Sequence, residues 1–210
     1  MGSTTTQTTI ANRALQLLGY KPIGSINDND RGARAMNRAY QPVLLSELRK
    51  NFWSFAIKRA ILAASTTQPA FGMANYFPLP GDFVVLAMPD QITNYCFGAI
   101  PPTPNSNAEY NDWQIENNNG VISIASNQPS PINIRYVSSN VTESMFDYSF
   151  AEAMSASLAT ETCEELTQSN TKLATVAKIY EQAIEDAKKR NAFEMKPIRP
   201  PTAPWILARM

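Results

Sequence analysis

The chain has 210 residues, with 18 basic side chains, 18 acidic side chains and no histidine. This length is enough for one large domain, or for a body with an insertion, and the core of such a chain is stable without a disulfide or a structural metal ion. The lack of histidine excludes Ser-His and Cys-His catalysis and the usual zinc sites, and since no Walker loop or GxGxxG motif is present we expect no cofactor.

Two helices are predicted near the N-terminus. The first has Thr8 or Thr9 available as its N-cap and ends at Gly19. The second follows the polar residues 27–30, whose oxygen atoms can cap it, and we expect Pro42 to kink it. The apolar stripes consist of Ile10, Ala14, Leu17 and Leu18 in the first helix and of Ala33, Met36, Tyr40, Val43, Leu44 and Leu48 in the second.

An arginine stripe lies on the second predicted helix. Arg31, Arg34 and Arg38 follow one another at intervals of three and four residues, which places them on one face. Guanidinium groups suit phosphate oxygens, so the stripe is a candidate for sequence-independent contact with DNA. The alternatives are a solvated face and a subunit interface in which the arginines pair with acids of a neighbour.

Short β-type segments occupy the middle of the chain. After the aromatic residues Phe52, Trp53 and Phe55, which we interpret as core rather than as a base-stacking platform, residues 57–62 favour a strand. Further strands are predicted at residues 83–88, 94–97, 113–115, 121–124 and 132–137. Residues 117–120, Asn-Asn-Asn-Gly, are typical of a hairpin turn.

A helical hairpin is predicted after the strands. Residues 149–152 read as a capping box that starts its first helix. A break at residues 168–170 separates this helix from a second one. The apolar positions are Phe150, Met154 and Leu158 in the first helix and Leu173, Val176, Ala177, Tyr180, Ile184 and Ala187 in the second.

The predicted fold class is therefore α+β. Residues 1–62 and 145–195 form a helical body, residues 63–144 a small antiparallel β insertion, and residues 196–210 an extended C-terminal arm. The arm has four prolines, which prevent a helix or a central strand, yet it carries apolar side chains that free tails normally lack. We therefore expect it to dock onto a partner through Lys196, Pro197, Ile198, Arg199, Pro200, Pro201, Pro204, Trp205, Ile206 and Leu207.

Charge is distributed unevenly along the chain. Residues 1–62 carry a net charge of +6, residues 63–144 of −5, residues 145–192 of −3 and residues 193–210 of +2. This separation favours complementary contacts between copies or with partners. The polar N-terminus and the short apolar runs predict a soluble protein with no membrane span, and Cys96 and Cys163 are expected to be buried rather than paired.

Three carboxylate pairs are the nominal catalytic candidates. They are Asp28 with Asp30, Glu143 with Asp147, and Glu164 with Glu165, and two carboxylates are what glycoside cleavage requires. A structural role is the better interpretation, because the first pair lies where a helix is capped, the second precedes the predicted capping box, and neighbours on a helix point in different directions. We expect the protein not to be an enzyme.

Several ordered segments resemble one protein family. The segments are residues 10–15, 40–48, 53–56, 76–83, 134–137, 146–147, 150–153, 158–159 and 166–169, followed by Tyr180 and Ala187. Together they are similar to the head-to-tail adaptors of short-tailed bacteriophages, also called tail tubular protein A, over roughly residues 8–193. The resemblance implies a helical body with a β insertion, assembled as a ring of about twelve copies beneath the portal of a DNA-filled capsid.

The function expected from this resemblance is structural. A dodecameric ring would join the portal protein to the tail, where it would meet the nozzle or tail tubular protein B, and genomic DNA would pass through it without sequence recognition. The arm would anchor each subunit on the portal, in the virion neck, after assembly in the host cytoplasm. The alternatives are a peptidoglycan hydrolase carried on the virion and a tail-tube or neck ring that contacts the nozzle instead of the portal.

Overall fold

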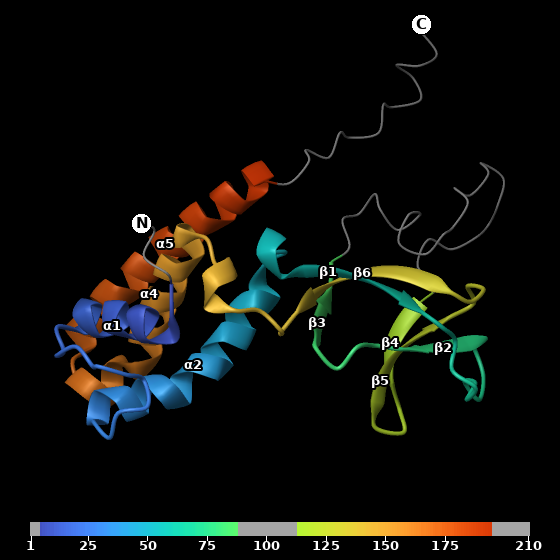
Figure 1. The fold of residues 1–210 in the computed structure, drawn as a ribbon, viewed down its shortest axis with the longest axis horizontal. Coiled ribbons are helices and arrows are strands. Elements are labelled where there is room, and N and C mark those ends of the chain that lie inside the picture. Colours follow the sequence, from blue (N-terminus) through green and yellow to red (C-terminus); the bar gives the residue numbers. More distant parts are fainter. Residues whose placement is uncertain (1–4, 88–112, 195–210) are drawn as a thin grey trace, which may run out of the picture.

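The computed structural model describes residues 5–87 and 113–194, and within them the fold is α+β. Helices gather at one end of the molecule and strands at the other (Figure 1). The helices are α1 (Gln7–Leu18), α2 (Arg31–Lys50), α4 (Tyr148–Thr167) and α5 (Asn170–Glu194), with short 3-10 turns η1 (Ser54–Ala56) and η2 (Glu143–Met145). The strands are β1 (Ile57–Leu62), β2 (Asn75–Pro78), β3 (Phe83–Leu86), β4 (Trp113–Asn118), β5 (Val121–Ser126) and β6 (Ile132–Ser138).

The helical body consists of α1, α2, α4 and α5, so it is built from both ends of the described chain. Helix α4 packs against the other three. Its large buried side chains are Phe150, Met154 and Leu158, and the buried alanines between them allow close approach of the neighbouring helices. The predicted helical hairpin is confirmed, because Gln168 adopts a left-handed conformation (φ 51°) that ends α4 directly before α5.

Two predicted helix starts were wrong. The N-cap of α1 is Thr6, whose side chain accepts from the Thr9 N–H at 3.2 Å while the Thr9 hydroxyl accepts from the Thr6 N–H at 2.8 Å. Helix α4 begins after Asp147, whose Oδ1 accepts from the Phe150 N–H at 2.9 Å. The predicted capping box at residues 149–152 therefore lies inside the helix, because an acidic side chain two residues earlier already satisfies the free N–H.

The ends of α1 and α2 follow the sequence more closely. Gly19 ends α1 in a left-handed conformation (φ 72°), as predicted, which an L side chain rarely adopts. Asp30 is the N-cap of α2 and accepts from the Gly32 N–H at 3.1 Å. Helix α2 runs without interruption through Pro42 to Lys50.

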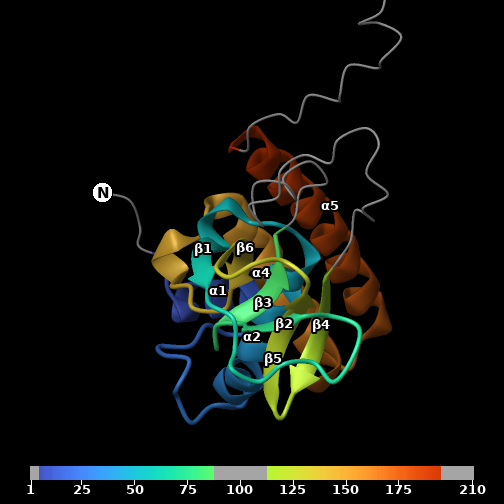
Figure 2. The ribbon, with the colours of Figure 1, turned by 90° about the vertical axis from the view of Figure 1, so that its right-hand side faces the viewer.

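The β unit consists of two three-stranded antiparallel sheets, in the orders β1-β6-β3 and β2-β5-β4. Figure 2 views the molecule from this side, with the strands in front of the helices. Strand β6 is shared between two cores: Ile134 lies in the core of the β unit, whereas Val137 joins the core of the helical body. The apolar core of the β unit consists of Leu62, Phe77, Leu86, Ile124, Ile132, Ile134 and Tyr136.

Most predicted strands are present, with shifted ends. The segments at 57–62, 83–88, 113–115, 121–124 and 132–137 correspond to β1, β3, β4, β5 and β6, and the hairpin turn is confirmed by positive φ angles at Asn119 (50°) and Gly120 (88°). The segment at 94–97 lies outside the described residues. Strand β2 was not predicted, and β1 pairs with β6 although it precedes the predicted start of the insertion at residue 63.

The described residues also bear on two smaller predictions. In these parts of the chain, no helix is both long and apolar enough to cross a membrane. Cys163 is buried with a free thiol, whereas Cys96 lies outside the described residues.

Candidate functional site

The arginine stripe borders an open groove between α2 and the C-terminal end of α4. The cavity measures about 450 Å³ and is lined by Arg31, Arg34, Asn37, Arg38 and Glu165. Helical spacing on α2 brings the three arginines to one exposed face, as predicted. We call this surface the arginine groove.

Glu165 is the acid that the arginine stripe meets. Arg38 Nη2 lies 2.5 Å from Glu165 Oε1, and Arg31 Nη2 donates to the backbone carbonyl of the same residue. Carbonyl groups in the last turn of a helix have no partner within the helix, so Arg31 satisfies one of them in α4. Arg34 Nη1 donates to Asn29 Oδ1 at 2.9 Å. The acid partner thus lies within the same chain, which none of the predicted alternatives had named.

Acidic and polar side chains continue beyond the arginines. An adjoining cavity of about 500 Å³ shares Arg31 and Glu165 and is also lined by Glu164, Gln168, Ser169, Asn170 and Leu173. Two carboxylates beside three guanidinium groups leave little excess positive charge for the dense phosphates of DNA. The geometry suits a single carboxylate or amide of a protein partner better than a nucleic-acid backbone.

The candidate carboxylates before α2, Asp28 and Asp30, form hydrogen bonds and an ion pair within the fold. Asp28 Oδ2 accepts from the Gly24 and Ser25 N–H groups at 3.0 and 2.8 Å. Asp30 caps α2 and lies 2.8 Å from Lys21 Nζ, and the Lys21 hydrogen bond lowers the pKa of Asp30. Asp30 therefore matches the helix-capping interpretation, whereas Asp28 closes a turn at residues 24–28 and does not cap a helix.

The pair at Glu143 and Asp147 is likewise divided between two tasks. Asp147 caps α4, and Glu143 Oε1 accepts from the Tyr40 hydroxyl at 3.2 Å. Burial, together with the Glu143 charge and hydrogen bond, raises the pKa of Tyr40 well above its ordinary value. Glu164 and Glu165 line the adjoining cavity described above, where Glu165 is held by arginines.

The aromatic residues after α2 are core, as predicted. Trp53 is fully buried, and its ring centroid lies 4.8 Å from that of Phe150 in an edge-to-face arrangement. Phe55 packs on both Phe146 and Phe150, with centroids 5.3 and 4.9 Å apart. This aromatic cluster joins the segment that leaves the helical body to the segment that returns to it.

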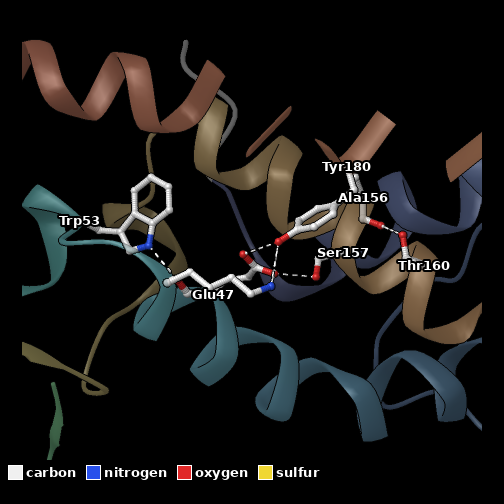
Figure 3. A network of polar contacts seen from close by, with 7 residues as sticks. Glu47, Trp53, Ala156, Ser157, Thr160 and Tyr180 are labelled. Atoms are coloured by element: carbon white, nitrogen blue, oxygen red, sulfur yellow. Dashed lines mark hydrogen bonds and ion pairs between the residues drawn. The ribbon is translucent and has the colours of Figure 1, made fainter. Parts of the chain in front are cut away.

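The sequence analysis did not identify Glu47, a fully buried carboxylate, as a structural or functional residue. Its Oε1 accepts from Lys50 Nζ at 2.8 Å, Ser157 Oγ at 2.7 Å and the Tyr180 hydroxyl at 3.0 Å (Figure 3). Burial alone would lower the pKa of Lys50, but the hydrogen bonds to Glu47 and Tyr180 outweigh it and the pKa is raised. The contacts join α2, α4 and α5, so their role is to fix the helices. The sequence did hold a signal, because Glu47 falls on the apolar face of α2, three residues after Leu44.

A second unpredicted cluster surrounds Asp82, in the turn between β2 and β3. Its carboxylate accepts from Lys58 Nζ at 2.9 Å, Ser138 Oγ at 2.7 Å and the Tyr136 hydroxyl at 3.0 Å. The Lys58 hydrogen bond, helped by those from Ser138 and Tyr136, lowers the pKa of Asp82 to about 2 despite the opposing effect of burial. The cluster ties β1 and β6 to this turn.

The predicted docking arm, Lys196 to Leu207, lies outside the described residues, and its role stays a prediction. Within residues 5–87 and 113–194, no three side chains of Cys, Asp or Glu are grouped so that they could hold a metal ion. Neither a comparison with protein-family models nor one with curated proteins found a match for this chain.

Proposed function

We propose that the protein is a head-to-tail adaptor of a short-tailed bacteriophage, a virion structural subunit that joins the portal to the tail. Copies pack side by side in a closed ring through a head-to-tail interface. The ring provides part of the channel through which DNA leaves the capsid. The function is mechanical, because no bond is made or broken.

The observation that carries this proposal is the position of the residues by which the chain resembles the adaptors. Trp53, Phe55, Phe146 and Phe150 form one aromatic cluster, where the chain passes from the helical body to the β unit and back. Part of the resemblance thus lies in residues that hold the two parts of the subunit in a fixed relation. A fixed relation is what a connector that transmits load between capsid and tail requires.

The carboxylates support a structural rather than an enzymatic role. Asp28, Asp30, Glu143 and Asp147 accept hydrogen bonds that cap helices, close a turn or hold a tyrosine. A zymogram with peptidoglycan tests the alternative directly, with Glu143→Gln and Asp147→Asn as variants. We expect no clearing from the wild-type protein, and clearing that either variant abolishes would contradict the proposal.

Electron microscopy of the protein mixed with its portal protein is the main test. We expect a ring of protein density, twelve-fold like the portal, on the face of the portal that meets the tail. The tail nozzle or tail tubular protein B, mixed in parallel, identifies the opposite partner. Rings that bind only the nozzle would assign the protein to a tail-tube or neck ring instead.

Removal of residues 196–210 tests the arm separately. Because the four prolines of this segment predict an extended arm outside the helical body, we expect the truncated protein to keep its circular dichroism spectrum and its melting temperature. It should nevertheless fail to bind the portal, since many weak contacts in a ring act together through avidity. Normal binding by the truncated protein would show that the arm is not the anchor.

A further inference from the structure

Two arginines lie directly opposite each other on neighbouring strands of one sheet. Arg59 in β1 is the register partner of Arg135 in β6, the middle strand of its sheet. Residues that are opposite each other in an antiparallel pair project from the same face, with Cβ atoms about 4.5–5.5 Å apart. Like charges at such positions destabilise the pairing of the strands. The fold therefore contains a repulsion that an anion between the two side chains would offset.

The arginine pair lies at the border of the part of this sheet face that the helices cover. The next pair towards the helices, Ile57 with Val137, packs in the core of the helical body. The next pair in the other direction, Ile61 with Asn133, is exposed. Side chains alternate between the two faces of a strand, so these three pairs form one row from the helical core to solvent. A ligand in solvent can therefore reach the arginines.

Neither guanidinium group has an acidic partner in the described parts of the chain. The ion pairs within residues 5–87 and 113–194 include neither Arg59, which is exposed, nor Arg135, which is half-buried. The Nε of Arg135 is buried and has no hydrogen-bond partner, whereas its two Nη atoms are not buried in this way. Partial burial makes a charge without a counter-charge costly. The stem of Arg135 is thus held in the protein while the end of its side chain can meet an anion.

The acids of the described β unit are engaged elsewhere. Asp82 accepts from Lys58, which lies on the opposite face of β1 because it directly precedes Arg59. Glu116 belongs to the other sheet, where it accepts from the Tyr76 hydroxyl at 3.0 Å. The arginine pair therefore differs from the arginine groove, in which a carboxylate of the same chain is already bound.

We infer that Arg59 and Arg135 form a binding site for a phosphate group. Guanidinium groups donate in a fork that fits phosphate oxygens. The oxygens of a tetrahedral phosphate point in several directions, so two guanidinium groups can bind it together. The Asn133 amide, two residues before Arg135 on the same face, adds a further donor beside the pair. The site goes beyond the proposed function and does not depend on it. Its ligand is free phosphate or a phosphate of a DNA backbone, and the experiments below distinguish these two sources.

Thermal unfolding in phosphate and in chloride, at equal ionic strength and pH, tests the site. Phosphate also stabilises proteins in general, because it is excluded from their surface, so each protein is compared with itself in the two salts. We expect phosphate to raise the melting temperature of the wild type by about 2–4 °C more than that of Arg59→Gln or Arg135→Gln. Arg190→Gln, which removes an exposed arginine from α5, is the matched control and should respond as the wild type does. Equal responses of all these proteins would overturn the inference.

Two further readouts separate a binding site from a structural pair. In chloride, Arg59→Gln should melt no lower than the wild type, because the substitution removes the repulsion between like charges. A lower melting temperature in chloride, with an undiminished response to phosphate, would mean that Arg59 is structural. In NMR spectra, the Arg135 Nε–H signal, assigned by its loss in Arg135→Lys, should shift when inorganic phosphate is added. A signal that does not move would overturn the inference.

Titration with a short DNA duplex distinguishes the two sources of phosphate. If the DNA backbone is the ligand, Arg59→Gln and Arg135→Gln should each reduce the slope of log affinity against log salt concentration by about one. Arg190→Gln should leave that slope unchanged. A response to inorganic phosphate, without any effect of the two substitutions on DNA binding, would assign the site to free phosphate. A wild type that responds to neither would overturn the inference.

Discussion

In the helical body, α4 packs against three other helices, and buried side chains from all four belong to one core that also contains Trp53. In the β unit, a much smaller set of buried residues fills the space between two three-stranded sheets. Stabilisation by apolar burial grows with the area removed from water, so apolar burial stabilises the body more than it stabilises the β unit.

The central polar cluster is also more deeply buried in the helical body than in the β unit. The body contains a carboxylate, Glu47, that is fully buried and bonded from three helices. In the β unit, the corresponding centre is Asp82, which is 24 % exposed and joins β1, β6 and a turn. The comparison teaches that the body acts as the stable platform, whereas the β unit depends on a small core and one polar cluster.

The largest effect is expected from Trp53→Ala in the body. The substitution removes a fully buried ring that packs on Phe150, together with its hydrogen bond to the Glu47 carbonyl at 2.9 Å. We expect the free energy of unfolding to fall by about 3–5 kcal/mol, a large part of the 5–15 kcal/mol typical of a domain. Urea denaturation followed by circular dichroism measures it.

Phe71→Ala is the control for that measurement. Because this ring is exposed, its loss should change the free energy of unfolding by no more than about 0.5 kcal/mol. A loss below about 1 kcal/mol for Trp53→Ala would mean that the aromatic cluster does not hold the body together.

Phe77→Ala tests whether the β unit opens separately. Phe77 is fully buried between the sheets and pairs with Ile124 across β2 and β5. We expect a local loss of about 3 kcal/mol, because little else fills this core. Hydrogen exchange measured by mass spectrometry should speed up in β5 and β6 but not in α4. Equal acceleration in α4 would show that the two regions unfold as one unit.

The helical body was predicted more completely than the β unit, because the sequence patterns that mark helices are local whereas strand pairing depends on residues far apart in the chain. Helical periodicity and the Asn-Gly turn are local, so the helices and the β4–β5 hairpin were predicted. Strand β2 was missed because Pro78 and Pro80 suggest a loop; Pro78 is tolerated because β2 is an edge strand. The start of α1 was misplaced because the neighbouring threonines are equally good caps, and only the structure shows that Thr6 is used.

The candidate site shows the same limit. Spacing alone placed Arg31, Arg34 and Arg38 on one face, but it could not identify Glu165, which lies 127 positions after Arg38. The Asp82 cluster likewise depends on the pairing of β1 with β6, which brings Lys58 opposite Tyr136. Pairings over such distances are decided by the packing of the whole chain, not by a local pattern.

A smaller effect is expected from acid at Asp82. Its folded pKa of about 2 lies below the ordinary 3.8, so its bonds stabilise the fold above pH 4, and this contribution is lost as the pH falls towards 2. After allowance for partial exposure, we expect roughly 1–2 kcal/mol in this window. Asp82→Asn should be less stable at pH 7 and should lose less stability between pH 4 and 2. The same loss in both proteins would show that other carboxylates cause it.

The smallest effect is expected from Arg38→Ala in the arginine groove. The guanidinium lies 2.5 Å from Glu165, but the two side chains are 69 % and 43 % exposed, and exposed ion pairs contribute about 0–1 kcal/mol because water and salt screen them. Urea denaturation should therefore show a change below about 0.5 kcal/mol, with little dependence on added salt.

Lys189, which lies 3.8 Å from Glu185 on the exposed face of α5, is a suitable control for alanine substitution. A loss above 1 kcal/mol for Arg38→Ala alone would mean that the pair is needed to join α2 to α4. A small loss would show that Arg38 can leave Glu165 at little cost to the fold, as a subunit interface of the proposed ring would require.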